Sequence, residues 1–213
     1  MLHTVLGLRA LGQRAALVAH PEGELFRRMS EGHDLVPLAA SGEIDLLAKE
    51  YGLSVLKTRD NHLALMEAAA DKQNRFVGGT KGGFIYNDFL FASDGMYSVA
   101  KLLECLAQTR KHLGELDRET PHLHLVKKAV PCSWSVKGRV MRHLMKDSER
   151  IQRELIDGVK IFPRQQDHRT SVLLNPDRTR PLFHINAESE DLGFAESLAG
   201  EYAEKLQQWI NNE

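Results

Sequence analysis

The strongest constraint on the fold is a strand, helix and strand pattern within residues 34–57. A short apolar run at 34–38 precedes Ser41, a residue type that caps helices, and Gly52 stands where a helix would end. Apolar residues recur between them with helical spacing, at Ile44, Leu47, Ala48 and Tyr51. Residues 53–57 then predict a second strand. Because two strands joined by a helix usually pair in parallel, the pattern predicts an α/β domain.

The first half continues with the same two kinds of element. A helix is predicted from Asn61 to about Asp71, followed by a strand around 75–77 and a glycine cluster. The aromatic-rich stretch 84–91 predicts one further strand. Asp94 is placed to cap a helix that carries a wide apolar stripe.

A change of composition suggests where the first domain ends. Residues 109–120 are charged and poor in large apolar residues, and Pro121 follows. Such a segment is typical of a domain boundary. We therefore expect an N-terminal helical segment at 1–33, for which a remnant of a preceding domain is one reading, an α/β domain at 34–115, and a smaller domain at 122–213.

The second half has mixed patterns. Strands are predicted at 123–130, 158–162 and 171–174, with a helix after the first of them. Residues 181–189 alternate, with Phe183, Ile185 and Ala187 on one face and His184 and Asn186 on the other. A final helix carries Leu198, Tyr202, Leu206 and Trp209 on one stripe. Because helices and strands do not alternate strictly, this half is expected to be α+β.

Composition narrows the class of protein. Lys plus Arg is 28 against 29 for Asp plus Glu, and this balance argues against a nucleic-acid or anionic-membrane partner. No apolar stretch is long enough to span a bilayer. Cys105 and Cys132 stand far apart, which excludes a disulfide scaffold and fits a reducing, cytoplasmic location. Residues 1–19 contain two arginines and no acid, a composition that can mark a mitochondrial transit peptide. An ordinary helix is favoured, because Arg9 and Arg14 interrupt the apolar run and no small-residue cleavage signature is present.

Two loops are candidate ligand sites, and the first is rich in glycine. This glycine loop is Gly78, Gly79, Thr80, Lys81, Gly82 and Gly83. Four glycines allow a backbone to approach a ligand closely, and Lys81 is suited to a phosphate. The order matches neither a Walker A loop nor G-x-G-x-x-G. A tight turn between two strands explains the glycines equally well.

The second candidate, the arginine loop, is residues 175–181, which lie between two predicted strands. Arg178 and Arg180 are placed to form a fork for phosphate or carboxylate. Further cations at Lys160, Arg164 and Arg169 give a local positive excess. The alternative, an ordinary solvated hairpin tip, is favoured on the residues alone.

Other groups of potentially reactive residues give weaker evidence of a functional site. His122 and His124 face the same side of a predicted strand, but no third ligand stands at metal-binding spacing nearby. Cys105 is expected to pack in a helix, and no nucleophile elbow accompanies the serines. We therefore expect no catalytic residue and no metal ligand in this chain.

These loops, in order, resemble the C-terminal half of the α-D-phosphohexomutase family (phosphomannomutase, phosphoglucomutase and relatives). Residues 34–58 resemble the opening of its third domain, and 78–84 stand where the family has G-G-E-x-S-G-H. Residues 157–161 resemble D-G-[VI]-[RK], and 175–181 stand at R-P-S-G-T-E-P. The resemblance covers about 34–213. It implies a sugar-reading glycine loop and a phosphate-binding arginine loop, with Asn175, Arg178, Thr179 and Arg180 at the phosphate.

The departures from the family are extensive. In the glycine loop Thr80 replaces the sugar-reading Glu, Gly82 the Ser and Phe84 the His. In the arginine loop the family's Arg, Ser, Gly and Glu are replaced by Asn175, Asp177, Arg178 and Arg180. A carboxylate at 177 repels a phosphate unless the two arginines outweigh it.

Residues 131–142, P-C-S-W-S-V-K-G-R-V-M-R, resemble a segment of one subgroup. There a mutase-like region follows a sugar-nucleotidyltransferase domain in mannose-1-phosphate guanylyltransferases, some of them bifunctional with phosphomannomutase. The family's phosphoserine loop and its D-G-D-x-D-R-like magnesium loop have no counterpart in these 213 residues. The chain thus looks like a C-terminal fragment or a split-gene product, with magnesium expected only if a missing N-terminal half complements it.

Three readings follow from this resemblance. The first is a non-catalytic or regulatory module of a GDP-mannose-forming guanylyltransferase. The second is a split half of an active phosphomannomutase or phosphoglucomutase, and the third is a structural oligomerisation piece. The implied partners are a sugar phosphate or sugar nucleotide, and either a nucleotidyltransferase or a mutase N-terminal half. No nucleic acid and no membrane is expected.

Overall fold

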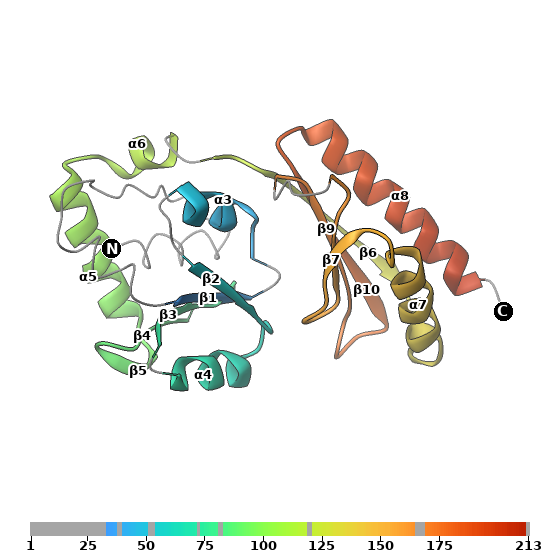
Figure 1. Cartoon of the computed structure of the whole chain (residues 1–213), viewed down its shortest axis with the longest axis horizontal. Coiled ribbons are helices and arrows are strands. Elements are labelled where there is room, and N and C mark those ends of the chain that lie inside the picture. The colour runs from blue at the N-terminus through green and yellow to red at the C-terminus, as the bar shows by residue number, and fades with distance from the viewer. Residues whose placement is uncertain are drawn as a thin grey trace. The chain divides into compact units, whose positions relative to one another are not determined.

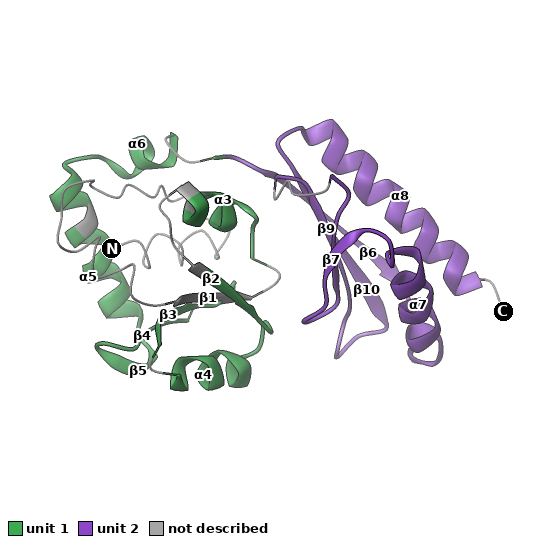
Figure 2. Cartoon of the chain, in the orientation of Figure 1, with its two compact units in different colours: residues 1–121 green, residues 122–213 purple. Residues whose placement is uncertain are grey.

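The chain divides into two compact units, residues 1–121 and 122–213 (Figure 2). The computed structural model describes residues 33–37, 40–50, 54–71, 73–80, 83–118, 121–164 and 169–211. Apart from His33, the predicted N-terminal segment 1–33 lies outside the described residues. The division falls at the end of the charged segment 109–120, but that segment is not a bare linker. It contains helix α6 (Leu113–Arg118), whose Leu116 is fully buried.

The first unit is built on one five-stranded sheet with the order β2-β1-β3-β4-β5 (Figure 1). Its strands are β1 (His33–Pro37), β2 (Ser54–Thr58), β3 (Asn74–Gly78), β4 (Phe84–Tyr86) and β5 (Leu90–Ser93). β1 pairs in parallel with both β2 and β3, whereas β4 and β5 run antiparallel. The crossovers are helices α3 (Glu43–Glu50) and α4 (His62–Ala70). The predicted parallel crossover is therefore confirmed.

Polar side chains fix where the helices of this unit begin. Ser41 Oγ accepts a hydrogen bond from the Glu43 amide at 3.2 Å, ahead of α3. Asn61 Oδ1 accepts one from Ala64 at 2.9 Å, and Asp94 Oδ1 one from Tyr97 at 2.7 Å, ahead of α5 (Gly95–Thr109). Such caps satisfy amide groups that have no partner within the helix.

The two faces of this sheet bury different side chains. Val77 and Ile85 pack against Leu65 and Ala69 of α4. The neighbouring residues point to the opposite face, where Tyr86 meets Tyr97 of α5 with ring centroids 5.0 Å apart. In Figure 1, α4 lies on one side of the sheet and α3 on the other. The unit is an α/β/α sandwich, which agrees with the α/β domain that the sequence predicts.

The aromatic stretch 84–91 is not the single strand that the sequence predicts. It forms two short strands, β4 and β5, joined by a turn at 87–89. The Asn87 amide donates to the carbonyl oxygens of Ala69 and Asn74, and Phe89 stacks on Tyr97 with centroids 3.8 Å apart. These contacts bend the chain where alternation alone suggested that it continues.

The second unit contains a five-stranded, wholly antiparallel sheet with the order β6-β10-β9-β8-β7. Its elements are β6 (His124–Pro131), α7 (Trp134–Asp147), β7 (Gln152–Glu154), β8 (Val159–Phe162), β9 (Ser171–Pro176), β10 (Leu182–Ser189) and α8 (Leu192–Asn211). Strand β7 was not predicted, because its three residues Gln-Arg-Glu carry no apolar signal. The unit is α+β, as expected.

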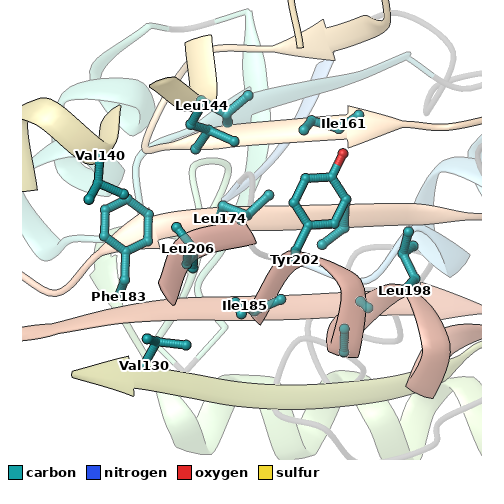
Figure 3. Close-up of a cluster of buried hydrophobic side chains, with 14 of the residues drawn as sticks. Val130, Val140, Leu144, Ile161, Leu174, Phe183, Ile185, Leu198, Tyr202 and Leu206 are labelled. Carbon is teal, nitrogen blue, oxygen red and sulfur yellow. The ribbon is translucent and has the colours of Figure 1, made fainter. Parts of the chain in front are cut away.

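One apolar cluster holds this unit together (Figure 3). Phe183 and Ile185 of β10 are fully buried, as the alternation of that strand predicts. They meet side chains from the neighbouring strands and from both helices: Ile161, Leu174, Val140, Leu144, Leu198, Tyr202 and Leu206. Burial raises the pKa of the Tyr202 phenol to about 12.

None of the helices in the described residues combines the length and hydropathy needed to cross a membrane.

Gly158, between β7 and β8, has a φ of +127° and lies close to β9. An added Cβ would overlap the Leu174 carbonyl oxygen and stand 2.6 Å from the Cβ of Asn175. We expect Gly158→Ala to lower the free energy of unfolding by about 2–4 kcal/mol, measured by urea denaturation. The control is Gly138→Ala in α7, where an added Cβ meets nothing within 4 Å and helix propensity favours Ala. Equal effects of the two substitutions would contradict this account.

Candidate functional site

The glycine loop of the first unit is the connection between β3 and β4. Gly78 pairs with Phe84 across these antiparallel strands, and a Cβ on Gly78 would lie only 3.0 Å from the Phe76 ring. Gly83 has a φ of +81°, a conformation that L side chains rarely adopt. Gly79 is buried, and Lys81 and Gly82 lie outside the described residues. The backbone structure alone therefore explains why glycine occupies at least two of these positions, Gly78 and Gly83.

The same loop lies at the carboxyl ends of the parallel strands. Thr80 follows β3, and its hydroxyl donates to Asp60 Oδ2 at 2.6 Å. Asp60 follows β2, so these two strands bring the pair together. Open α/β sheets bind ligands at this edge. Sequence reasoning missed Asp60, although a carboxylate directly after a parallel strand is a recognisable signal.

The arginine loop is the tip of the β9–β10 hairpin. The ladder of paired residues ends at Pro176 and Phe183, and the Asp177 amide donates to the Leu182 carbonyl oxygen at 3.0 Å. The backbone thus has the hairpin form that was the alternative reading of this loop. Its side chains, however, are arranged around one carboxylate.

The carboxylate of Asp177 accepts hydrogen bonds from its own loop on both oxygens. Oδ1 accepts from the Thr179 amide at 2.8 Å, the Thr179 hydroxyl at 3.0 Å and the Arg180 amide at 2.8 Å. Oδ2 accepts from Arg180 Nε at 2.9 Å and lies 2.8 Å from His184 Nε2. Only 9% of the Asp177 side chain is exposed. We call these groups the Asp177 ring of donors.

This ring strongly favours the charged form of the carboxyl group. The hydrogen bond with His184, followed by those with the Thr179 and Arg180 amides, holds the pKa of Asp177 far below its usual range. His184 was predicted to face away from the core, and it does so while contacting Asp177. The loop therefore carries an internal anion at neutral pH.

The two arginines do not form the predicted fork. Arg178 Nη2 lies 2.6 Å from Asp157 Oδ1, whereas Arg180 pairs with Asp177. This ion pair joins Asp157, the aspartate of the D-G-V-K motif, to Arg178 of the arginine loop, which lies 21 positions later in the sequence. Phosphate binding by Asn175, Arg178, Thr179 and Arg180 stays a prediction.

A buried lysine supports the loop from beneath. Lys137 of α7 is only 8% exposed, and its Nζ donates to the carbonyl oxygens of Asp177 and Arg180, each at 2.6 Å. The same Nζ lies 3.7 Å from the centroid of the Trp134 ring. The Cys132 amide donates to the Pro181 carbonyl oxygen at 2.8 Å. Residues 131–137, the first part of the segment 131–142 that carries the subgroup resemblance, therefore form the floor of the arginine loop.

The remaining candidates do not converge on a site. Lys160 is 3% exposed, Arg169 pairs with Glu190 at 2.6 Å, and Arg164 lies over the Phe194 ring. Within the described residues no group of three or more His, Cys, Asp and Glu is placed to hold a metal ion. Cys132 is buried, and the Cys105 side chain lies outside the described set.

We expect Lys137→Met to lower the free energy of unfolding by about 2–4 kcal/mol. The substitution keeps the apolar stem but removes two charge-assisted hydrogen bonds, which leaves two carbonyl oxygens without this partner. The matched control is Lys146→Met, an exposed lysine in the last turn of the same helix. Denaturant titration of the two variants checks this, and a loss no larger than that of the control would contradict the role of Lys137.

The depressed pKa of Asp177 predicts a specific acid response. The unfolded-state value is near 3.8, so the charged carboxylate stabilises the fold above about pH 4, and this contribution is lost as the pH falls further. We therefore expect the stability of Asp177→Asn to decline less than that of wild type from about pH 5 to about pH 2. Urea titrations across this range measure it. Glu190→Gln, which neutralises an exposed carboxylate, is the control, and an unchanged pH profile for Asp177→Asn would refute the assignment.

Comparison with known proteins gives one family match. Residues 24–123 match the family model described as "Phosphoglucomutase/phosphomannomutase, alpha/beta/alpha domain III". This range contains the whole described sheet of the first unit and its glycine loop. The α/β/α layering found above agrees with that description.

Similar proteins extend the likeness into the second unit. The chain is 28% identical over 188 residues to a probable phosphoglucosamine mutase of Pyrococcus abyssi, covering 86% of this chain and 40% of the relative. It is 27% identical over 162 residues to a phosphoglucosamine mutase of Methanococcus maripaludis, covering 75% and 35%. The chain therefore spans well under half the length of these curated relatives.

A solved structure resembles both units. A phosphoglucomutase/phosphomannomutase family protein from Burkholderia thailandensis matches with a TM-score of 0.74 at 16% identity. The match covers 99% of this chain and 42% of that protein. At this identity the likeness concerns the fold.

Proposed function

We propose that this chain is a phosphohexomutase-type module that transfers no phosphate by itself, since residues 24–123 match the family model described as "Phosphoglucomutase/phosphomannomutase, alpha/beta/alpha domain III". It acts in sugar-nucleotide metabolism as a non-catalytic or regulatory part of a larger assembly. Its ligand is a sugar phosphate or a sugar nucleotide.

The observation that carries this proposal is the occupied arginine loop. In the resemblance this loop binds the substrate phosphate, yet here its amides, its hydroxyl and Arg180 already bind the carboxylate of Asp177. Arg178 is committed to Asp157. Phosphoryl transfer needs preorganised cations and donors for the developing charge. A loop whose donors are taken is poorly suited to that task.

The glycine loop supports a retained role in sugar recognition. It stands at the carboxyl edge of the parallel strands, and Thr80 and Asp60 place a hydroxyl and a carboxylate there. These groups donate to and accept from sugar hydroxyls, although they differ from the glutamate of the resemblance. We therefore expect this edge of the sheet to bind a sugar without taking part in phosphoryl transfer.

The proposed partner is a mannose-1-phosphate guanylyltransferase. Support comes from residues 131–142, which resemble that subgroup and which include the floor of the arginine loop. Helix α5 also presents a large apolar surface, because Met96, Val99 and Leu103 are 86%, 56% and 59% exposed. Surfaces of this kind often serve contacts with other protein.

A second candidate function is half of an active mutase. The names of the similar relatives favour it, since both are phosphoglucosamine mutases and the chain spans only 35–40% of their length. In that case another segment supplies the phosphoserine and the magnesium ligands, and this chain contributes the sugar and phosphate loops.

Turnover separates the two candidates. We expect the purified chain to show no activity with mannose 1-phosphate, glucose 1-phosphate or glucosamine 1-phosphate in a coupled assay containing magnesium and a bisphosphate activator. A full-length phosphoglucosamine mutase serves as the positive control. Activity that follows the chain through successive purification steps would overturn the non-catalytic proposal. Activity that appears only after addition of a separately expressed mutase N-terminal half would establish the second candidate.

A further inference from the structure

We propose that the tip of the arginine loop, residues 177–180, is an anion-binding site occupied by its own side chain, and that Asp177 alone keeps an external phosphate monoester out. The inference rests on the proposed function for the class of ligand: the sugar of that ligand is recognised at the glycine loop, and its phosphate is not bound by the arginine loop as long as Asp177 occupies it. It adds a specificity-determining residue and a latent site that opens when residue 177 is changed.

The Asp177 ring of donors has the composition of an oxyanion site. Two successive amides, those of Thr179 and Arg180, converge on Oδ1 at 2.8 Å each, and the Thr179 hydroxyl joins them at 3.0 Å. Successive amides that point at one oxygen form the anion-binding concavity known as a nest. The Arg180 guanidinium and the His184 imidazole add two side-chain donors on the other oxygen. A phosphate group uses the same kinds of donor.

The shape of this site does not depend on the Asp177 carboxylate alone. Lys137 holds the carbonyl oxygens of Asp177 and Arg180, and the Asp177 amide is bonded to Leu182. Cys132 fixes Pro181 at the other end of the loop. Four main-chain bonds to this loop thus remain when the side chain of residue 177 is shortened. The amides of residues 179 and 180 are then left pointing at an unfilled position.

The carboxylate of Asp177 excludes an external anion for two reasons. It is tethered within the loop, so its effective concentration at the ring is far above the millimolar range of a free phosphate. It also repels a phosphate dianion at short distance, since only 9% of the side chain is exposed to screening water. Asp157 does not fill the ring, because it pairs with Arg178.

The test is a titration of inorganic phosphate, followed by isothermal calorimetry and by phosphorus NMR. The variants are Asp177→Ala, which empties the ring, and Asp177→Asn, which removes the charge but keeps an acceptor. Glu190→Ala is the matched control, because it removes one exposed, arginine-paired carboxylate of the same unit that follows the opposite end of β10 from the loop. A double variant, Asp177→Ala with Arg180→Ala, removes a donor from the emptied ring.

We expect Asp177→Ala to bind phosphate at least about tenfold more tightly than wild type, with Asp177→Asn in between. Glu190→Ala should match wild type, and the double variant should lose most of the gain. Mannose 1-phosphate is then titrated in the same way to test a phosphate monoester.

Three results would overturn the proposal. One is a folded Asp177→Ala chain, checked by its thermal transition, that binds phosphate no better than wild type. Another is an equal gain for Glu190→Ala, which would make the effect one of net charge. If Asp177→Ala does not fold, Asp177→Asn and Asp177→Ser decide, and the absence of a gain in both overturns it. None of these results depends on turnover, so failure here is distinguishable from failure of the proposed function.

Discussion

An ammonium group almost removed from water must be surrounded by acceptors, and Lys137 satisfies this requirement with the backbone of the arginine loop. The loop therefore closes over the start of α7 as a consequence of where one lysine is buried. The Trp134 ring covers the same group, which explains why an aromatic residue stands one helical turn before the lysine. Everything distinctive about the loop, including the ring of donors around Asp177, is built on this support.

The arrangement of the first unit could be predicted to a large extent from its sequence. Capping residues such as Asn61 and Asp94 mark the starts of helices by local chemistry, and a helix between two apolar runs implies a parallel pair. The failures have a common physical origin. The split of residues 84–91 depends on Asn87, whose amide reaches the carbonyl oxygens of residues 69 and 74. Such tertiary contacts leave no periodic trace in the sequence.

In the candidate site, too, local features could be predicted from the sequence, whereas tertiary contacts could not. Both loops were located from glycines, prolines and arginines, because turns have a strong compositional signature. The partners of those residues were not predictable, since Arg178 pairs with Asp157 and Thr80 with Asp60, each across about 20 positions. The repulsion expected from Asp177 was stated in terms of an incoming phosphate. In the structure the hydrogen-bond donors of the arginine loop already bind the Asp177 carboxylate, so the loop's own side chain occupies the position expected for the phosphate.

The order of strands in the second unit has a consequence for how it forms. β6, the first strand of the unit, pairs along its whole length with β10 and lies at the edge of the sheet. The two strands are separated by some fifty residues of chain, so the pairing closes a long loop and gives this unit a high contact order. On the ribosome, β6 emerges long before its partner and presents unpaired edge groups in the meantime. The sheet is completed only when nearly the whole unit has been synthesised, so the free edge of β6 stays exposed to other chains until β10 pairs with it.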